Sequence, residues 1–147
     1  MTTPGETMGT TAPATDCYDV IVIGAGAGGV YAMYRFSRQG LSVLGLESAD
    51  GVGGVWYHNR YPGARVDVPS LDYCYFFSRD LYREWQWPEL YSSQPDLERY
   101  INHAADRFDL KKYIRFDHRV TAARWCADRS LWQVDTSAGN RFACRFL

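Results

Sequence analysis

The sequence predicts an α/β fold in which a βαβ unit with a parallel sheet is followed by an irregular, aromatic-rich segment and a small antiparallel β-meander. A short β-branched run ends at a glycine-rich turn, after which come a pattern of helical period and a second apolar run. Nearly half of the aromatic residues, which make up 16% of the chain, lie between Trp56 and Tyr91. Short strand-like runs separated by turn residues occupy the C-terminal part. These patterns are typical of parallel strands, a ligand-shaped loop region and hairpins, respectively.

The βαβ unit begins with a buried strand predicted at Tyr18–Ile23, which stops at Gly24. A helix is predicted over Val30–Gln39, because its apolar residues share one face and Gly40 supplies a stop. The second strand is predicted at Leu41–Glu47. The unit has the size expected of a right-handed crossover between parallel strands.

The irregular segment runs from Ser48 to Tyr91, where Gly, Pro and aromatic residues replace any regular period. An amphipathic helix is then predicted from Gln94 to near Asp109, with Pro95 suited to its first turn. The later strands are predicted at Ile114–Phe116, Val120–Ala122, Trp132–Thr136 and Phe142–Phe146. Because the chain stops at Leu147, directly after an apolar strand, we expect residues 17–147 to be an incomplete, N-terminal part of a larger domain.

The composition argues against several classes of partner. With 16 Lys+Arg against 17 Asp+Glu, the formal net charge of -1 leaves no field that would attract nucleic acid or an acidic membrane. No apolar run is long enough for a transmembrane helix, so no membrane partner is expected. Residues 1–16 are rich in Thr, Gly, Pro and Ala and lack the basic and apolar parts of a secretory signal, so we interpret them as a flexible leader.

Cysteine and histidine spacing indicates neither a disulfide framework nor a metal site. The four cysteines are Cys17, Cys74, Cys126 and Cys144. They form no C-x-x-C pair, and the three histidines (His58, His103 and His118) form no triad or metal set with their neighbours. Reduced thiols are typical of a cytoplasmic protein, which is the location we expect.

A glycine fingerprint, Gly24-x-Gly26-x-x-Gly29, follows the first predicted strand and opens the first helix. In this context Gly24 permits the tight turn, Gly26 lets the backbone approach a pyrophosphate, and Gly29 lets the helix pack on the strand. The helix start then binds the anion through its free N–H groups. A glycine-rich turn without a ligand is the alternative, and the flanking strand and helix favour a Rossmann-like dinucleotide-binding domain instead.

Glu47 ends the second predicted strand, where an acidic side chain accepts hydrogen bonds from an adenosine ribose. A carboxylate there repels a 2′-phosphate, so the position predicts FAD or NAD rather than NADP. A solvated acid at a strand end is the other reading of an isolated Glu.

Several further motifs follow in a fixed order. They are G-V-G-G-V-W-Y at 51–57, N-R-Y-P-G-A-R-x-D-V at 59–68, Y-C-Y at 73–75, E-W-x-W at 84–87, Y-x-x-Q-P at 91–95 and A-D-R-F-D-L at 105–110. With them, the sequence from about Tyr18 to Leu147 resembles the Baeyer–Villiger monooxygenases, flavoproteins of the phenylacetone, steroid and cyclohexanone monooxygenase kind. The resemblance implies the N-terminal, FAD-binding part of an enzyme that uses NADPH and O₂ to convert ketones to esters or lactones by way of a flavin peroxide.

The resemblance also implies roles for individual residues. The FAD pyrophosphate would be bound by Gly24, Gly26 and Gly29, its ribose by Glu47, and its adenine by Val120. The flavin half would lie along Gly54, Val55 and Trp56, and its isoalloxazine ring near Tyr73 and Asp67. The nicotinamide of NADPH would lie beside a segment that contains Ala64, Arg65 and Asp67. Asp67 would also be catalytic, by holding an essential arginine that lies outside this chain. For Trp56, Tyr73 and Asp67 taken singly, core rings and a turn acid are the simpler readings.

Two departures from the family pattern put substrate scope in doubt. Pro69 stands where the family commonly has an acid, and Phe77 stands where it commonly has Ser. The second glycine fingerprint for NADPH is absent, so the remainder of the enzyme or a complementing chain would be needed. The alternatives are an N- or S-oxygenating flavin monooxygenase, a flavin dehydrogenase, and a non-catalytic nucleotide-binding module or partner-completed subunit.

Overall fold

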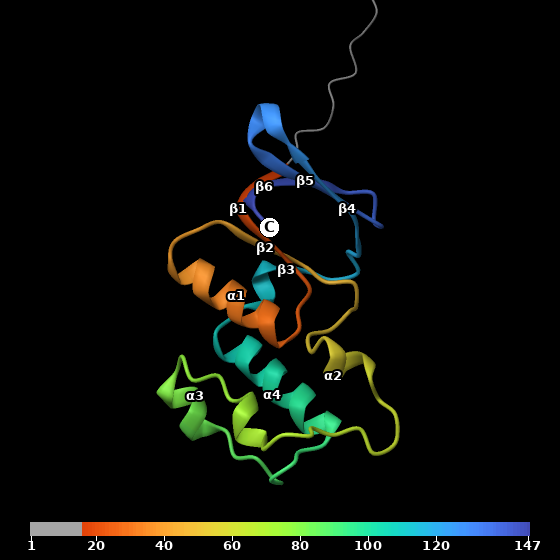
Figure 1. The fold of residues 1–147 in the computed structure, drawn as a ribbon. Coiled ribbons are helices and arrows are strands. Elements are labelled where there is room, and N and C mark those ends of the chain that lie inside the picture. The colour runs from red at the N-terminus through yellow and green to blue at the C-terminus, as the bar shows by residue number, and fades with distance from the viewer. Residues whose placement is uncertain (1–15) are drawn as a thin grey trace, which may run out of the picture.

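The computed structural model describes residues 16–147, and Figure 1 shows their arrangement. The leader predicted at 1–16 lies outside the described residues except for Asp16, which begins the first strand. In chain order the elements are β1 Asp16–Ile23, α1 Ala27–Arg38, β2 Val43–Leu46, α2 Val55–His58, the 3-10 helix η1 Ser70–Tyr73, α3 Arg79–Glu84, α4 Gln94–Arg107, η2 Lys111–Tyr113, β3 Ile114–Arg115, β4 Val120–Cys126, η3 Ala127–Arg129, β5 Leu131–Thr136 and β6 Arg141–Phe146.

A single six-stranded sheet of order β3-β2-β1-β6-β5-β4 forms one layer of the molecule. The neighbours from β3 to β6 are parallel, whereas β6, β5 and β4 are antiparallel, as the predicted meander requires. The predicted α/β class with its parallel βαβ unit is therefore confirmed. The parallel pairing of β6 with β1, which joins Cys17 to Ala143 and merges the meander with the βαβ sheet, did not follow from the sequence pattern.

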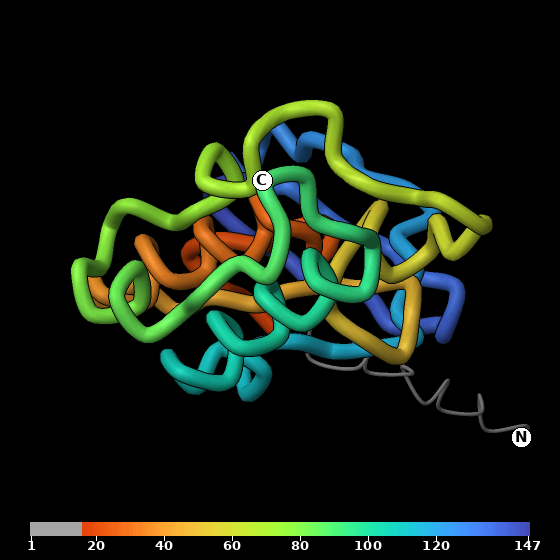
Figure 2. The backbone as a smooth tube through the Cα atoms, turned by 90° about the horizontal axis from the view of Figure 1, so that it is seen from below, coloured from red at the N-terminus to blue at the C-terminus, as the bar shows by residue number. Residues whose placement is uncertain are grey.

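The helices lie on one side of this sheet, with α1 nearest to it and α4 beyond α1 (Figure 1). The aromatic-rich segment contains α2, η1 and α3 and is therefore less irregular than the sequence predicted. Seen from the side opposite the sheet, it curves around α4 (Figure 2). The start predicted for α4 at Gln94 is confirmed, because Ser93 and Asp96 form a reciprocal capping box there.

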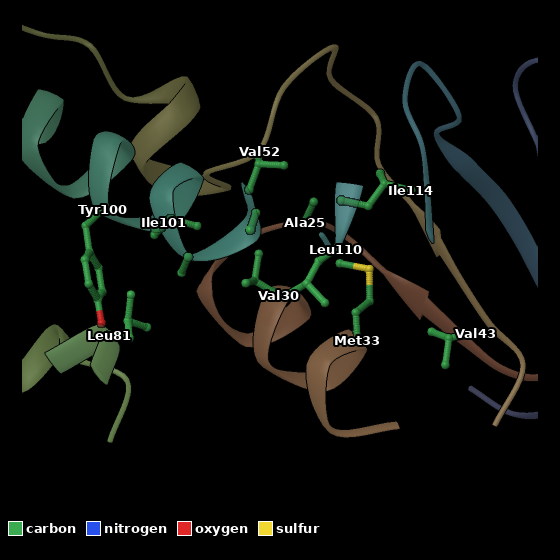
Figure 3. Packing of buried hydrophobic residues seen from close by; sticks show 12 residues of the cluster. Ala25, Val30, Met33, Val43, Val52, Leu81, Tyr100, Ile101, Leu110 and Ile114 are labelled. Carbon is green, nitrogen blue, oxygen red and sulfur yellow. The ribbon is translucent and has the colours of Figure 1, made fainter. Parts of the chain in front are cut away.

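Two apolar clusters hold the layers together. The larger one joins α1 and α4 to the sheet, and Figure 3 shows Val30 and Met33 of α1 lying between Ile101 of α4 and Val43 of β2. The smaller one, which includes Ile21, belongs to strands β1, β2, β5 and β6. Side chains alternate along β1, so that this strand contributes to both clusters and fixes the position of the glycine loop at its end.

Candidate functional site

The loop between β1 and α1 is built around glycines. Gly24 has a φ of +94°, a left-handed conformation that an L side chain rarely adopts, and its N–H donates to the Leu46 carbonyl at 2.8 Å. A Cβ atom on Gly29 would lie 2.0 Å from the Gly24 carbonyl oxygen. Gly29 is therefore required for the packing of α1 against the end of β1, as the fingerprint predicted.

A second glycine loop, residues 51–54, packs directly on the first. The Gly53 N–H donates to the Ala25 carbonyl at 3.0 Å. A Cβ atom on Gly54 would lie 2.8 Å from the Gly26 Cα. The sequence assigned Gly54 to the cofactor alone and did not reveal this contact between the two loops.

The start of α1 is suited to binding an anion. Its N-cap is Gly26, which has no side chain to cap the helix, and the first turn contains no acidic residue. The first N–H groups of a helix point outward without intrahelical partners, and the helix dipole places positive charge among them. An anionic group at this position would complete their hydrogen bonding.

The Glu47 carboxylate lies directly after β2 and is 5% exposed. One of its oxygens accepts the Ala25 N–H at 2.6 Å, and the other accepts the Ala49 N–H at 2.8 Å and the Ser48 hydroxyl at 3.1 Å. Burial by itself raises the pKa of this carboxyl, but the hydrogen bonds from Ala25, Ala49 and Ser48 outweigh it and lower the pKa below its usual value. Glu47 is thus ionised at neutral pH and ties the end of β2 to the first glycine loop.

These groups line one cavity of about 350 Å³. Its lining residues are Ile23, Gly24, Gly26, Leu46, Glu47, Ser48, Gly54, Val55, His58, Arg119 and Val120. Six residues that the sequence singled out are therefore brought together: Gly24, Gly26, Glu47, Gly54, Val55 and Val120. Ile23 and Val55 are 52% and 62% exposed, which leaves large apolar side chains open to this cavity.

Sequence reasoning missed His58 and Arg119 as lining residues. The one signal for Arg119 was its place directly before Val120. His58 ends α2, so only the folding of the second glycine loop onto the first brings it to the cavity.

A second cavity, of about 380 Å³, is lined by Ala27, Gly28 and Tyr31 at the start of α1 and by residues 72–77. It includes Tyr73, whose ring meets that of Trp56 edge to face at a centroid distance of 5.7 Å. The Trp56 carbonyl accepts a hydrogen bond from the Gln94 side chain. Trp56 itself is half-buried and lines neither of the two cavities.

Tyr75 holds the segment that lines the second cavity against the start of α1, a contact that the sequence did not reveal. Its hydroxyl donates to the Ala27 carbonyl at 2.7 Å, and its backbone N–H donates to the Tyr100 hydroxyl at 2.6 Å. Burial raises the pKa of Tyr75, and it raises that of Tyr100 to about 12, so both hydroxyls stay protonated at neutral pH. The Y-C-Y motif thus anchors the aromatic-rich segment to α1.

Ala64, Arg65 and Asp67 lie in an extended stretch that pairs with the residues before α4 through an isolated antiparallel bridge from Arg65 to Ser93. Ala64 is buried, whereas the Arg65 guanidinium contacts Glu89 at 3.0 Å and the Tyr91 carbonyl at 2.9 Å. Asp67 is exposed, and this stretch lines neither of the two cavities. The structure therefore does not bring Asp67 together with the glycine loops.

Residues 16–147 contain neither a candidate metal site nor a candidate membrane-spanning helix. No group of three or more His, Cys, Asp or Glu side chains in that range is arranged to hold a metal ion. Within the same range, no helix has the length and apolar character needed to cross a membrane.

Comparison with known proteins gives a consistent set of relatives. Residues 22–82 match the family model of the NAD(P)-binding Rossmann-like domain. A 2-oxo-Δ3-4,5,5-trimethylcyclopentenylacetyl-CoA monooxygenase of Pseudomonas putida is 46% identical over 88% of this chain and 24% of its own length. A Baeyer–Villiger monooxygenase of Pseudooceanicola batsensis is 41% identical, and a phenazine N-monooxygenase of Lysobacter antibioticus is 37% identical, each over 88% of this chain and 24% of the relative.

Among solved structures, an oxidised steroid monooxygenase bound to NADP superposes with a TM-score of 0.88 and 54% identity. The match covers 90% of this chain and 25% of that one. The chain thus spans about a quarter of the length of the proteins that it matches.

Proposed function

We propose that this chain binds FAD at the glycine loops and serves a flavin-dependent oxygenation of ketones. In sequence and fold it resembles about a quarter of the length of a Baeyer–Villiger monooxygenase. The observation that carries the proposal is the cavity that joins the α1 start, the Glu47 carboxylate and the apolar side chains of Ile23 and Val55. The positive start of α1 suits the pyrophosphate of a dinucleotide, the Glu47 carboxylate suits its ribose, and the apolar side chains suit its adenine.

The two cavities support a cofactor that extends in both directions from the α1 start. Glu47 lies in one cavity, and Tyr73 lines the other together with several aromatic rings. A pyrophosphate held at the glycine loop before α1 would leave its adenosine in the first cavity and its flavin toward the second. Bound FAD would supply the redox and oxygen chemistry, while the protein orients the ring and excludes water.

Gly54 and Val55, which the sequence placed along the flavin half, line the cavity with Glu47 and are therefore proposed to contact the adenosine half instead. The remaining expected roles stay part of this proposal. NADPH is the proposed reductant, O₂ and a ketone the proposed substrates, and Asp67 the proposed partner of an essential arginine outside this chain. Ala64 and Arg65 are proposed to lie beside the nicotinamide. Because the chain spans a quarter of its relatives, a complete reaction would involve residues beyond those described.

Flavin release tests the binding proposal directly. We expect the purified polypeptide that carries this sequence in vivo to bind FAD, to release FAD rather than FMN on denaturation, and to lose bound FAD to competing ADP but not to competing FMN. The adenosine and pyrophosphate contacts lie in the glycine-loop cavity, which is the reason for this selectivity. Binding of FMN alone, or of NAD alone, would exclude the assignment.

Asp67→Ala tests the catalytic proposal in the polypeptide that carries this sequence in vivo. Charge-assisted contacts contribute about 1.5–3 kcal/mol, so losing one made only in the oxygenating state is expected to slow ester formation by about ten- to a hundredfold. FAD content should not change, because Asp67 does not line the glycine-loop cavity. Asp128→Ala, in the exposed η3 turn, is the matched control. Ester formation at the rate of that control would leave Asp67 a surface acid only.

Oxygenation of nitrogen is the second candidate function, and the similarity to a phenazine N-monooxygenase favours it. A parallel assay with a ketone and with an aromatic amine, each followed by NADPH consumption and product mass, separates the two. Turnover of the ketone alone supports ester formation, and turnover of the amine alone supports the second candidate.

A further inference from the structure

Arg119 lines the same cavity as Glu47, and backbone hydrogen bonds to the segments at Ser137 and Glu47 hold its main chain in place. Its carbonyl accepts the Ser137 N–H at 2.8 Å. The preceding residue, His118, donates its N–H to the Glu47 carbonyl at 2.8 Å. The position of Arg119 at the cavity is thus fixed by the sheet and does not depend on the side chain.

The guanidinium of Arg119 has no partner within residues 16–147, since it takes part in no ion pair or hydrogen bond there. Nearby arginines differ, because Arg115 lies 3.7 Å from Asp16 and Arg141 lies 2.7 Å from Asp135. Glu47 is not its partner, since the side-chain and backbone donors to the Glu47 carboxylate are those of Ala25, Ser48 and Ala49. Arg119, an exposed residue that lines the cavity, therefore carries an uncommitted, permanently charged planar group.

Besides Glu47, Ser48 and His58, the lining of this cavity includes four large apolar side chains. Ile23 and Val55 are more than half exposed, and Leu46 and Val120 complete the lining. Exposed apolar side chains in a concave site favour a ligand that covers them. A planar heteroaromatic ring satisfies both features, because one face can lie on aliphatic groups and a guanidinium can stack on the other.

From this we infer that Arg119 is a specificity-determining residue, whose guanidinium packs on the adenine of the bound cofactor. The inference rests on the proposed FAD binding and adds to it a contact that Glu47 and the glycine loops do not supply. Because the recognised group is the neutral base, the contribution of Arg119 should be the same for every ligand that contains adenosine.

The experiment measures dissociation constants of adenosine, ADP and FAD for the polypeptide that carries this sequence in vivo and for its Arg119→Ala variant, with adenosine read by competition against FAD. A guanidinium–ring contact contributes about 0.5–2 kcal/mol, so Arg119→Ala is expected to raise all three constants by the same factor, about two- to thirtyfold. Arg119→Lys keeps the charge but loses the plane and should recover little of the affinity. Arg129→Ala, in the η3 turn away from the cavity, is the matched control, and the melting temperature of each variant reports its folding.

Three outcomes would overturn the inference. The first is that the dissociation constants of Arg119→Ala equal those of the wild type. The second is a loss of affinity confined to ADP and FAD, and the third is full recovery of affinity in Arg119→Lys. Either of the last two would assign Arg119 to the phosphates. A wild-type chain that binds none of the three ligands would refute the proposed function and the inference together, whereas normal wild-type binding with an unaffected Arg119→Ala refutes the inference alone.

Discussion

Replacing Gly29 with Ala is expected to unfold the glycine loop and abolish FAD binding. The new Cβ would lie 2.0 Å from the Gly24 carbonyl oxygen, a backbone atom that cannot move without separating α1 from β1. Overpacking typically costs about 1–3 kcal/mol, and a clash this close to backbone belongs at or above the upper end of that range. Urea unfolding and flavin fluorescence measure the two effects.

Gly28→Ala is the matched control, because it adds the same methyl group one residue earlier in the same helix turn. No atom lies within 4 Å of the Cβ position at Gly28. Alanine is favoured over glycine inside a helix by about 0.5–1 kcal/mol, so this variant should be slightly more stable than the wild type. Equal stability of the two variants would show that the close packing of α1 on β1 does not exist in solution.

Replacing Glu47 with Gln is expected to produce the second-largest effect. In the wild type, both carboxylate oxygens accept hydrogen bonds from backbone N–H groups, one from Ala25 and the other from Ala49. The glutamine amide keeps one oxygen but places its NH₂ group against one of these two N–H donors. A buried donor left without an acceptor costs about 1–3 kcal/mol, so stability should fall by that amount. FAD affinity should fall by about ten- to a hundredfold with it, because the carboxylate also fixes the loop that binds the pyrophosphate.

The effect of Glu47 should depend on pH in a defined direction. Hydrogen bonding lowers the pKa of this carboxyl in the folded state, so its contribution is fully present above the usual glutamate pKa of about 4.3. It is lost as the pH falls through the lowered folded-state value. The stability difference between wild type and Glu47→Gln should therefore be constant from about pH 6 to 8 and shrink in acid.

Glu89→Gln serves as the control for charge, because Glu89 forms an exposed ion pair with Arg65. Exposed pairs of this kind contribute about 0–1 kcal/mol. A Glu47→Gln variant no less stable than Glu89→Gln would mean that Glu47 is solvated and does not tie β2 to the glycine loop.

The βαβ unit and α4 could be predicted because their signals are local. The β-branched run before Gly24, the fingerprint glycines and the start of α4 at Gln94 each depend on residues close in sequence. The second strand is shorter than predicted, since only Val43–Leu46 pair within the sheet and Ser42 instead bonds with Asp19.

The features that the sequence did not reveal all depend on distant residues. The contact between Gly26 and Gly54, and the bonds of Tyr75 to Ala27 and Tyr100, form only when separate segments fold together. Local periodicity carries no information about such partners. The role of Asp67 remains a prediction, since it rests on a resemblance and not on a contact among the described residues.

The place of β6 between β1 and β5 has a consequence for the order in which the protein folds. Because β1 pairs with β6 in register from Asp16–Phe142 to Val20–Phe146, β1 leaves the ribosome long before the strand that becomes its second neighbour. Closing so long a loop makes this a high-contact-order step, which is slow relative to the local βαβ unit. Until β6 is synthesised, one edge of β1 offers unpaired backbone groups to any other strand nearby, so the nascent chain is aggregation-prone in the interval between the synthesis of β1 and that of β6.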